Sequence, residues 1–319
     1  MITKLVANSV SPAGAAGSLS ILIFHRVFAE PDPLHGDAPD ARKFDSVLRW
    51  LTRSFNVLPL DAAVEQLQSG SLPARAVSIT FDDGYRDNFS VALPLLLKHE
   101  VCATFFIATG FLDGGCMWND IVAEAIRNAS QSTLDLSASG LGSYSVATWE
   151  QKQQAMSVIL GALKHMPPPK RLEMAEELSR ICVSPRPHDL MMTTDQVQKM
   201  RAAGMQIGAH TRSHPILASL DEDAAQEEIS GSRSDLENML DESVTLFAYP
   251  NGRPAQDYHA QHVKMVEAAG YRAAVSTAAG ASKITSDILQ LPRFTPWDDT
   301  ELRFGLRLAN NIRRCPQTV

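Results

Sequence analysis

The sequence contains no long apolar run. No window approaches the about 18 consecutive apolar residues that a membrane-spanning helix needs. The first 20 residues carry one lysine and a short apolar patch at residues 5–7, which Asn8 interrupts, whereas the centre of an export signal has about 7–15 continuous apolar residues. We therefore expect no transmembrane segment and a cytoplasmic location.

Basic residues are also scarce. The chain has 29 Lys and Arg residues against 36 Asp and Glu residues, a formal net charge of −7. Proteins that bind nucleic acids or anionic membranes usually carry a basic excess, so neither partner is expected. The four cysteines show no paired CxxC spacing, which favours free thiols in a reducing compartment over a disulfide framework or a zinc knuckle.

Hydrophobic residues make up 45% of the 319 residues, which is typical of a globular protein. The length suits two average domains, or one α/β barrel of about 250 residues with an insertion. Short apolar runs rich in branched residues alternate with helical patterns; the runs are residues 20–24, 77–81, 103–107, 205–209, 244–248 and 288–291. Near-continuous apolarity is typical of strands buried on both faces of a parallel sheet, so this alternation predicts an α/β fold.

Between residues 112 and 192 the pattern changes. A Ser-rich stretch at 130–145 is followed by two predicted helices, 149–165 and 170–181, with proline breakers nearby. We interpret 112–192 as a helical insertion within a single domain of residues 1–319. Three roles are open for it: a lid, an oligomerisation element, or extra structure packed beside the barrel. Elsewhere, capping-box spacings at Thr193 and Ser219 predict helices that run to about residues 203 and 240.

Polar side chains follow the ends of the predicted strands. In a barrel of parallel strands, all carboxyl ends meet at one rim, where barrel enzymes build their sites. Carboxylates, imidazoles, an amide and a cation fall at such positions: Asp82, Asp83, His25, His210, His214, Asn251 and Arg293. We therefore expect these side chains to converge on one face of the sheet.

Asp82 and Asp83 come directly after the run at 77–81 and precede Gly84, which allows the backbone to turn sharply. Consecutive residues point in different directions, so one acid can bind a metal while the other faces a substrate. The plainer alternative is an Asp-Gly turn. The spacing does not match an EF-hand calcium loop.

His210 and His214 lie four residues apart in His-Thr-Arg-Ser-His. On one side of a helical turn both imidazoles would reach a single metal ion; the alternative is a pair of unrelated surface histidines. With an acid from another strand end, the donors become two nitrogens and one oxygen. That is the ligand set of a catalytic zinc site with an open position for water.

These segments resemble the polysaccharide deacetylases with a NodB-homology domain, carbohydrate esterase family four. The matching motifs are residues 80–84 (TFDDG), residues 210–214 (HTRSH, for H-[ST]-x-x-H) and the looser residues 247–252 (FAYPNG). The resemblance extends from about residue 21 to about residue 297, the insertion aside. It implies a distorted, TIM-like (β/α) barrel of seven or eight strands and metal-dependent removal of N-acetyl groups from amino sugars.

The resemblance also implies roles for individual residues. Asp83, His210 and His214 would hold one divalent metal ion, for which we predict Zn²⁺, although the ligand set also suits other divalent transition metals. Asp82 would be the general base that takes a proton from the attacking water. The backbone N–H that stabilises the oxyanion in the family aligns with Asn251.

The chain departs from the commonest form of the family in two places. Ala248 replaces the arginine that pairs with the base, and residues 291–293 (LPR) replace the Leu-x-His motif that supplies the acid. His25, at the end of the first strand, is similar to the acid of the permuted poly-N-acetylglucosamine deacetylases. We predict that His25 is the general acid and that Arg293 pairs with Asp82; the alternatives are a structural core histidine and a surface ion pair.

Three aromatic residues are predicted to bind substrate: Tyr249 in the third motif, and Trp118 and Trp297 as stacking faces for a sugar ring, with core packing as the alternative. The predicted function is metal-dependent deacetylation of an N-acetylated sugar or glycan precursor. Two alternatives remain open. One is hydrolysis of another non-peptide C–N bond, such as a formamide or a cyclic imide, and the other is a catalytically inert carbohydrate-binding protein.

Overall fold

A computed structural model describes residues 11–296 and 298–319, which form two compact units. The first unit contains the described residues up to Glu30 together with Ala38–Leu112 and Met192–Val319, and the second contains Pro31–Asp37 and Asp113–Met191. None of the described helices is long and apolar enough to cross a membrane.

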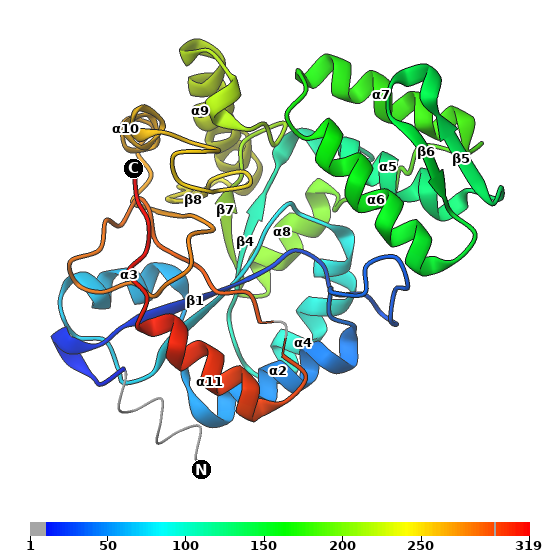
Figure 1. Cartoon of the computed structure of the whole chain (residues 1–319). Helices are drawn as coiled ribbons and strands as arrows, with labels where there is room; N and C mark the ends of the chain where they lie inside the picture. The colour runs from blue at the N-terminus through cyan, green and yellow to red at the C-terminus, as the bar shows by residue number, and fades with distance from the viewer. Residues whose placement is uncertain (1–10, 297) are drawn as a thin grey trace. The chain divides into compact units, whose positions relative to one another are not determined.

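The first unit is built on a curled parallel sheet (Figure 1). In spatial order its strands are β1 (Leu19–Phe24), β3 (Ala76–Phe81), β4 (Thr104–Ile107), β7 (Gln206–Ala209), β8 (Leu246–Ala248) and β9 (Ala273–Val275), while β2 (Asn56–Val57) pairs with β3. The predicted strand at 288–291 is not regular; instead Leu291 bridges to β9 and Phe294 bridges to β1. These bridges link the two edges of the sheet. The predicted α/β fold with a distorted (β/α) barrel is confirmed.

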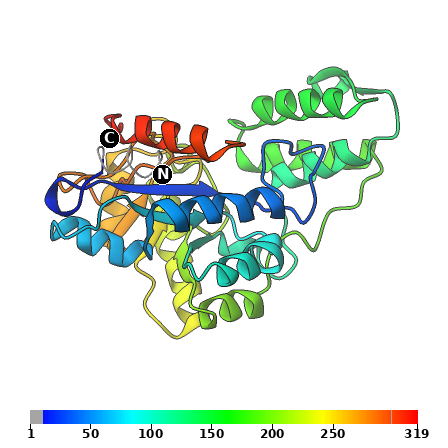
Figure 2. The same ribbon diagram turned by 90° about the horizontal axis from the view of Figure 1, so that it is seen from below.

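Helices join these strands, as the alternation of segments predicts. They are α2 (Ala41–Ser54), α3 (Leu60–Gln68), α4 (Leu93–Lys98), α8 (Thr194–Ala202), α9 (Glu222–Leu240), α10 (Ala260–Ala268) and α11 (Glu301–Ile312). Both views show α11 beside α2 (Figures 1 and 2), where the rings of Trp50 and Phe304 are 5.9 Å apart.

The two predicted capping boxes had different outcomes. The Thr193 hydroxyl accepts a hydrogen bond from the Gln196 amide at 3.2 Å and caps α8, as predicted. Ser219 does not cap α9, because it lies in a short 3₁₀ turn and its hydroxyl donates to the Ile216 carbonyl at 2.6 Å. Asp221 is the cap instead: its carboxylate accepts from the backbone N–H of residue 224 at 2.8 Å.

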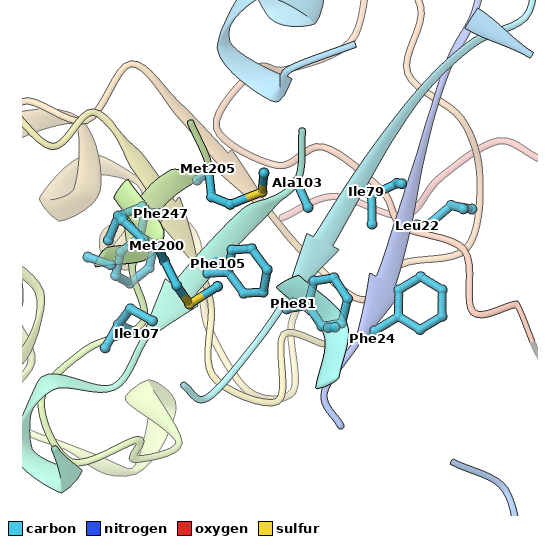
Figure 3. Close-up of a cluster of buried hydrophobic side chains, with 14 of the residues drawn as sticks. Leu22, Phe24, Ile79, Phe81, Ala103, Phe105, Ile107, Met200, Met205 and Phe247 are labelled. Carbon is cyan, nitrogen blue, oxygen red and sulfur yellow. The ribbon is translucent and has the colours of Figure 1, made fainter. Parts of the chain in front are cut away.

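Both faces of the sheet are buried, as near-continuous apolar strands require. Alternate residues of β1 face two different layers of the core: Leu22 and Phe24 on one side, Leu19 and Ile21 on the other. On the first side, Figure 3 shows a row of aromatic rings from β1, β3 and β4: Phe24, Phe81 and Phe105. Neighbouring rings of this row are stacked, with centroids 5.2 and 4.7 Å apart.

The register of β1 and β3 sets where the polar residues leave the sheet. Phe24 lies opposite Phe81 in the parallel pairing, and the Asp82 amide continues the ladder by donating to the Phe24 carbonyl at 2.9 Å. The next residues, His25 and Asp82, therefore emerge at the same end of adjacent strands. This is the relationship that the apolar runs predicted.

The second unit has its own apolar core. It contains α5 (Trp118–Asn128), α6 (Trp149–Leu163) and α7 (Pro168–Ile181), with a hairpin of β5 (Thr133–Leu136) and β6 (Gly142–Ser145). The Ser-rich stretch did not predict this hairpin, although Leu134 and Leu136 alternate with exposed residues and are buried. The segment Pro31–Asp37 joins the unit through Asp32, which accepts from Arg127 at 2.8 Å.

Candidate active site

Asp83, His210 and His214 converge at the carboxyl ends of β3 and β7, with one ligand atom from each within 4.8 Å of the others. Asp83 Oδ1 lies 3.5 Å from His210 Nε2 and 3.4 Å from His214 Nε2. This oxygen is buried and has no hydrogen-bond partner among the described residues. A buried carboxylate oxygen that faces two imidazole nitrogens fits a divalent cation, so the residues present match the metal site that the family implies.

The tautomer of His210 is determined by its backbone partner. Its Nδ1 lies 2.7 Å from the Ala248 carbonyl oxygen, which can only accept, so Nδ1 carries the proton. In the neutral form of the ring, Nε2 is therefore the unprotonated nitrogen, and it faces Asp83. A backbone carbonyl that orients a ligating imidazole in this way is a common feature of metal sites.

The two histidines converge by a route that the sequence did not predict. Residues 210–214 do not form a helical turn, so that expectation was wrong. Thr211 and His214 instead have left-handed φ angles of 63° and 51°, and the Thr211 hydroxyl oxygen accepts from the His214 amide at 3.1 Å. The resulting loop brings the His210 and His214 rings to a centroid distance of 4.7 Å.

Unfavourable backbone angles are concentrated around the site. Four of its residues have φ between 51° and 78°: Asp83, Thr211, His214 and Asn251. Left-handed angles are uncommon for residues other than glycine and cost free energy, so they persist only where the surroundings impose them. Their concentration here is typical of a functional site.

Arg293 lies against Asp82, the pairing that the sequence predicted. Two hydrogen bonds of 2.7 Å join Nη1 to Oδ1 and Nη2 to Oδ2. Arg293 is only 3% exposed and also donates to the Ser276 carbonyl at 2.9 Å and to the Thr80 hydroxyl at 3.3 Å. The alternative of a surface ion pair is therefore wrong, because this guanidinium is buried in the barrel.

Charge around the site keeps both aspartates ionised. Burial alone would raise the pKa of Asp82, but the charges of Arg293, His210 and His25 outweigh burial and lower it. Burial also opposes ionisation of Asp83, yet the neighbouring imidazoles of His210 and His214 hold its pKa well below the usual range. Burial lowers the pKa of His214 to about 4, so this imidazole is neutral near pH 7 and able to bind a metal.

His25 follows β1 beside Asp82 and is exposed, so it is not a core histidine. Its backbone is held by a residue that the sequence analysis left out of the predicted site. Asn88, which is fully buried, donates from Nδ2 to the His25 carbonyl at 2.9 Å. Asp87 accepts from the Val27 amide at 3.2 Å and from Arg26 Nε at 2.7 Å. The only signal for these residues was their position directly after the first motif.

Asn251 and Tyr249 lie on the loop that follows β8, at different depths. Within the described part of the chain, the backbone N–H of Asn251 donates to no acceptor, and the Asn251 carbonyl accepts from the Thr277 hydroxyl at 2.7 Å. Tyr249 has no exposed surface, and its ring stacks on Tyr258 at 3.9 Å. A fully buried ring offers a substrate nothing to contact. In this structure Tyr249 therefore belongs to the apolar core and does not line a substrate site as predicted.

Of the two tryptophans that were predicted to bind sugar, Trp118 lies among the described residues. Trp118 belongs to the second unit, is half-buried, and has the Arg171 guanidinium 4.7 Å from its ring centre. The sugar contact of Trp118 stays a prediction. Trp297 lies outside the described residues.

Comparison with known proteins identifies the family. The family model for polysaccharide deacetylases matches residues 69–133 and 171–274, which make up more than half of the chain. The Bacillus subtilis (strain 168) protein YxkH, which is named as a polysaccharide deacetylase, is 22% identical over 254 residues. That alignment covers 79% of this chain and 63% of YxkH, so the chain matches less than two thirds of the length of this relative.

Solved structures share the fold over nearly the whole chain. The Streptococcus pyogenes deacetylase PplD in complex with acetate has a TM-score of 0.61 and 19% identity, and the match covers 92% of this chain and 98% of PplD. IcaB from Ammonifex degensii has a TM-score of 0.60 and 17% identity, with 94% and 98% covered. The chain belongs to the polysaccharide deacetylase family, whose members are hydrolases acting on carbon–nitrogen bonds.

Proposed function

We propose that this chain removes N-acetyl groups from an amino sugar within a glycan and requires one divalent metal ion, Zn²⁺. Asp83, His210 and His214 would hold the ion. The observation that carries the proposal is the unpartnered, buried Asp83 Oδ1 facing two imidazole nitrogens, next to a second carboxylate that Arg293 keeps ionised. When bound, the cation supplies Lewis acidity to water and to the acetamide carbonyl.

In this mechanism Asp82 is the general base. Each of its oxygens accepts one hydrogen bond from Arg293, and a carboxylate oxygen has a second lone pair available. Because its pKa is lowered, Asp82 is ionised at neutral pH and able to take a proton from water as that water attacks the acetamide carbon. Arg293 keeps the carboxylate in a single orientation.

The remaining steps use Asn251 and His25. The backbone N–H of Asn251 is available to donate to the oxyanion that forms as the carbonyl is attacked, and one such donor is typically worth about 3 kcal/mol. His25 then gives a proton to the amine nitrogen as the C–N bond breaks. The products are acetate and a free amino sugar, and the proton taken up by Asp82 balances the one given by His25.

Zinc content and acetate release from N-acetylated chitooligosaccharides test the proposal. The Asp82→Asn variant should keep its zinc and lose about 100-fold or more in kcat, because the substitution removes the proton acceptor but none of the three proposed metal ligands. The Asp83→Asn variant should lose both zinc and activity. A fully active Asp82→Asn variant would remove Asp82 from the mechanism.

The same assay separates the two alternative functions. A hydrolase of formamides or cyclic imides would turn over those substrates and leave N-acetylated sugars intact. An inert carbohydrate-binding protein would bind the sugar without releasing acetate, with or without zinc.

A further inference from the structure

The loop that carries His210 and His214 is fastened to α9 by one carboxylate. Glu228 Oε2 accepts from the Arg212 amide at 2.8 Å and from the Ser213 amide at 2.9 Å. Glu228 Oε1 accepts from the Ser213 hydroxyl at 2.5 Å. A single side chain thus satisfies three donors of the segment between the two histidines.

The Arg212 side chain makes a second connection to the same helix. Its Nε and Nη2 donate to the two oxygens of Asp235, each at 2.8 Å. Asp235 Oδ2 also accepts from the Thr109 hydroxyl at 2.7 Å, and the Arg212 carbonyl accepts from the Gly110 amide at 2.9 Å. The loop is therefore held between α9 and the turn after β4.

Gly231 gives the Arg212 side chain room to cross α9. A Cβ atom at residue 231 would lie 2.4 Å from Arg212 Cζ and 2.5 Å from Nη1. The guanidinium has little freedom to move aside, because Asp235 holds it through two hydrogen bonds. The Arg212 side chain therefore packs directly against the backbone of α9 at Gly231, in addition to its hydrogen bonds with Asp235.

We propose that Glu228 is a positioning residue for the metal centre. It holds residues 212–213 so that His214 keeps its left-handed backbone and directs Nε2 at Asp83 Oδ1, 3.4 Å away. Without this carboxylate, two backbone N–H groups and the Ser213 hydroxyl would lose their acceptor, and the left-handed angles of Thr211 and His214 would lose their support. The inference depends on the proposed metal binding.

Zinc affinity of the purified chain, measured by isothermal titration calorimetry, tests the inference with two substitutions at one position. Glu228→Ala should weaken zinc binding about 10- to 100-fold, the usual effect of losing a residue that orients a ligand. Glu228→Gln should stay within about threefold of wild type, because its amide oxygen accepts from both backbone N–H groups and its amide nitrogen can donate to Ser213.

The pair distinguishes position from charge, because both variants lose the same negative charge. Equal zinc affinity in wild type and Glu228→Ala would overturn the inference, and so would equal losses in Glu228→Ala and Glu228→Gln. Asp223→Ala, which removes an exposed acid from the same helix, is the matched control and should bind zinc like wild type. A wild-type chain that binds no zinc would overturn the proposed function together with this inference.

A second variant covers the case in which Glu228→Ala does not fold. Gly231→Ala removes no hydrogen-bonding group and suits a helix better than glycine does, but it should displace Arg212 from Asp235 and weaken zinc binding about tenfold. Gly161→Ala is the control, since a Cβ at that helical position meets no atom within 4 Å. Wild-type zinc affinity in a folded Gly231→Ala variant would count against the role assigned to the α9 contacts.

Discussion

Arg293 and Asp82 are 211 residues apart in the chain, yet two parallel hydrogen bonds of 2.7 Å join them inside the barrel. Asp82 follows β3, and Arg293 lies on the segment that bridges β9 to β1. This is the pairing predicted for Arg293 in place of the arginine that Ala248 replaces. The closure of the sheet therefore also supplies the charge that keeps Asp82, the proposed general base, ionised.

Removing the guanidinium should cost both stability and activity. Arg293→Met would leave Asp82 buried without its partner, and breaking a buried pair in this way typically costs about 3–5 kcal/mol of unfolding free energy. Urea denaturation and kcat for acetate release measure the two effects. Arg272→Met is the control: Arg272 pairs with Glu65 at the surface, where such pairs are worth about 0–1 kcal/mol. Equal stability of the two variants would contradict the role given to Arg293.

His25→Asn should affect substrates according to their leaving group. An amine leaves only after protonation, so kcat for an N-acetylated sugar should fall about 10²- to 10⁴-fold without the general acid. A 4-nitrophenyl acetate ester has a leaving group that needs no proton, so its hydrolysis should change little, and the zinc content should stay the same. The control is His165→Asn, which alters another exposed histidine. Equal losses for the amide and the ester would exclude His25 as the acid.

Zinc should stabilise the folded chain, because the ligand atoms converge only after folding. At a zinc concentration 100 times its Kd, the expected gain is about 2.7 kcal/mol, visible as a higher Tm that excess EDTA reverses. Asp83→Asn should abolish the zinc-induced shift, whereas the adjacent Asp82→Asn should retain it. An unchanged shift in Asp83→Asn would show that zinc binds somewhere other than at this group of residues.

His262 should make stability depend on pH below neutrality. Burial lowers the pKa of His262 to about 4, whereas an unfolded histidine titrates near 6.5. Between these values the unfolded chain binds more protons than the folded chain, so stability is complete above about pH 6.5 and falls as the pH drops towards 4.

The His262→Gln variant isolates this effect. Its amide oxygen replaces Nδ1 as the acceptor for the His259 amide, a bond of 2.9 Å in the structure, and it does not titrate. Between pH 7.5 and pH 5, the wild type should lose about 2 kcal/mol more unfolding free energy than the variant does. Parallel stability curves from urea denaturation across this pH range would contradict the prediction.

The elements of the fold that the sequence predicted correctly are those that depend on short segments of the chain. Apolar runs of four or five residues followed by polar clusters indicated the central strands, because a strand buried on both faces has to be apolar along its whole length. Thr193 and Gln196 indicated the start of α8 for an equally local reason. The predicted strand at 288–291 is not regular: within it only Leu291 bridges to β9, and the bridge to β1 is made by Phe294, beyond the run. An apolar run does not show how many residues pair with a neighbouring strand.

In the candidate site, too, local features could be predicted from the sequence and tertiary contacts could not. The residue types and spacings of Asp82, Asp83, His210 and His214 singled out, from sequence alone, side chains that the structure brings together. The contribution of Glu228 could not be predicted, since an acid in the second turn of an amphipathic helix has the same sequence pattern whether it faces solvent or a loop. Likewise, nothing in the order of residues showed that Tyr249 would be buried.

The sequence by itself determined which chemical groups the chain brings to the ends of its strands, because strand burial and motif spacing are properties of short segments. Only the tertiary structure decided how those groups face one another: the left-handed loop at Thr211 and His214, the hydrogen bonds from α9 that hold that loop, and the burial of the Arg293–Asp82 pair inside the barrel. These relationships join segments tens to hundreds of residues apart, and their geometry depends on how the sheet curls and closes.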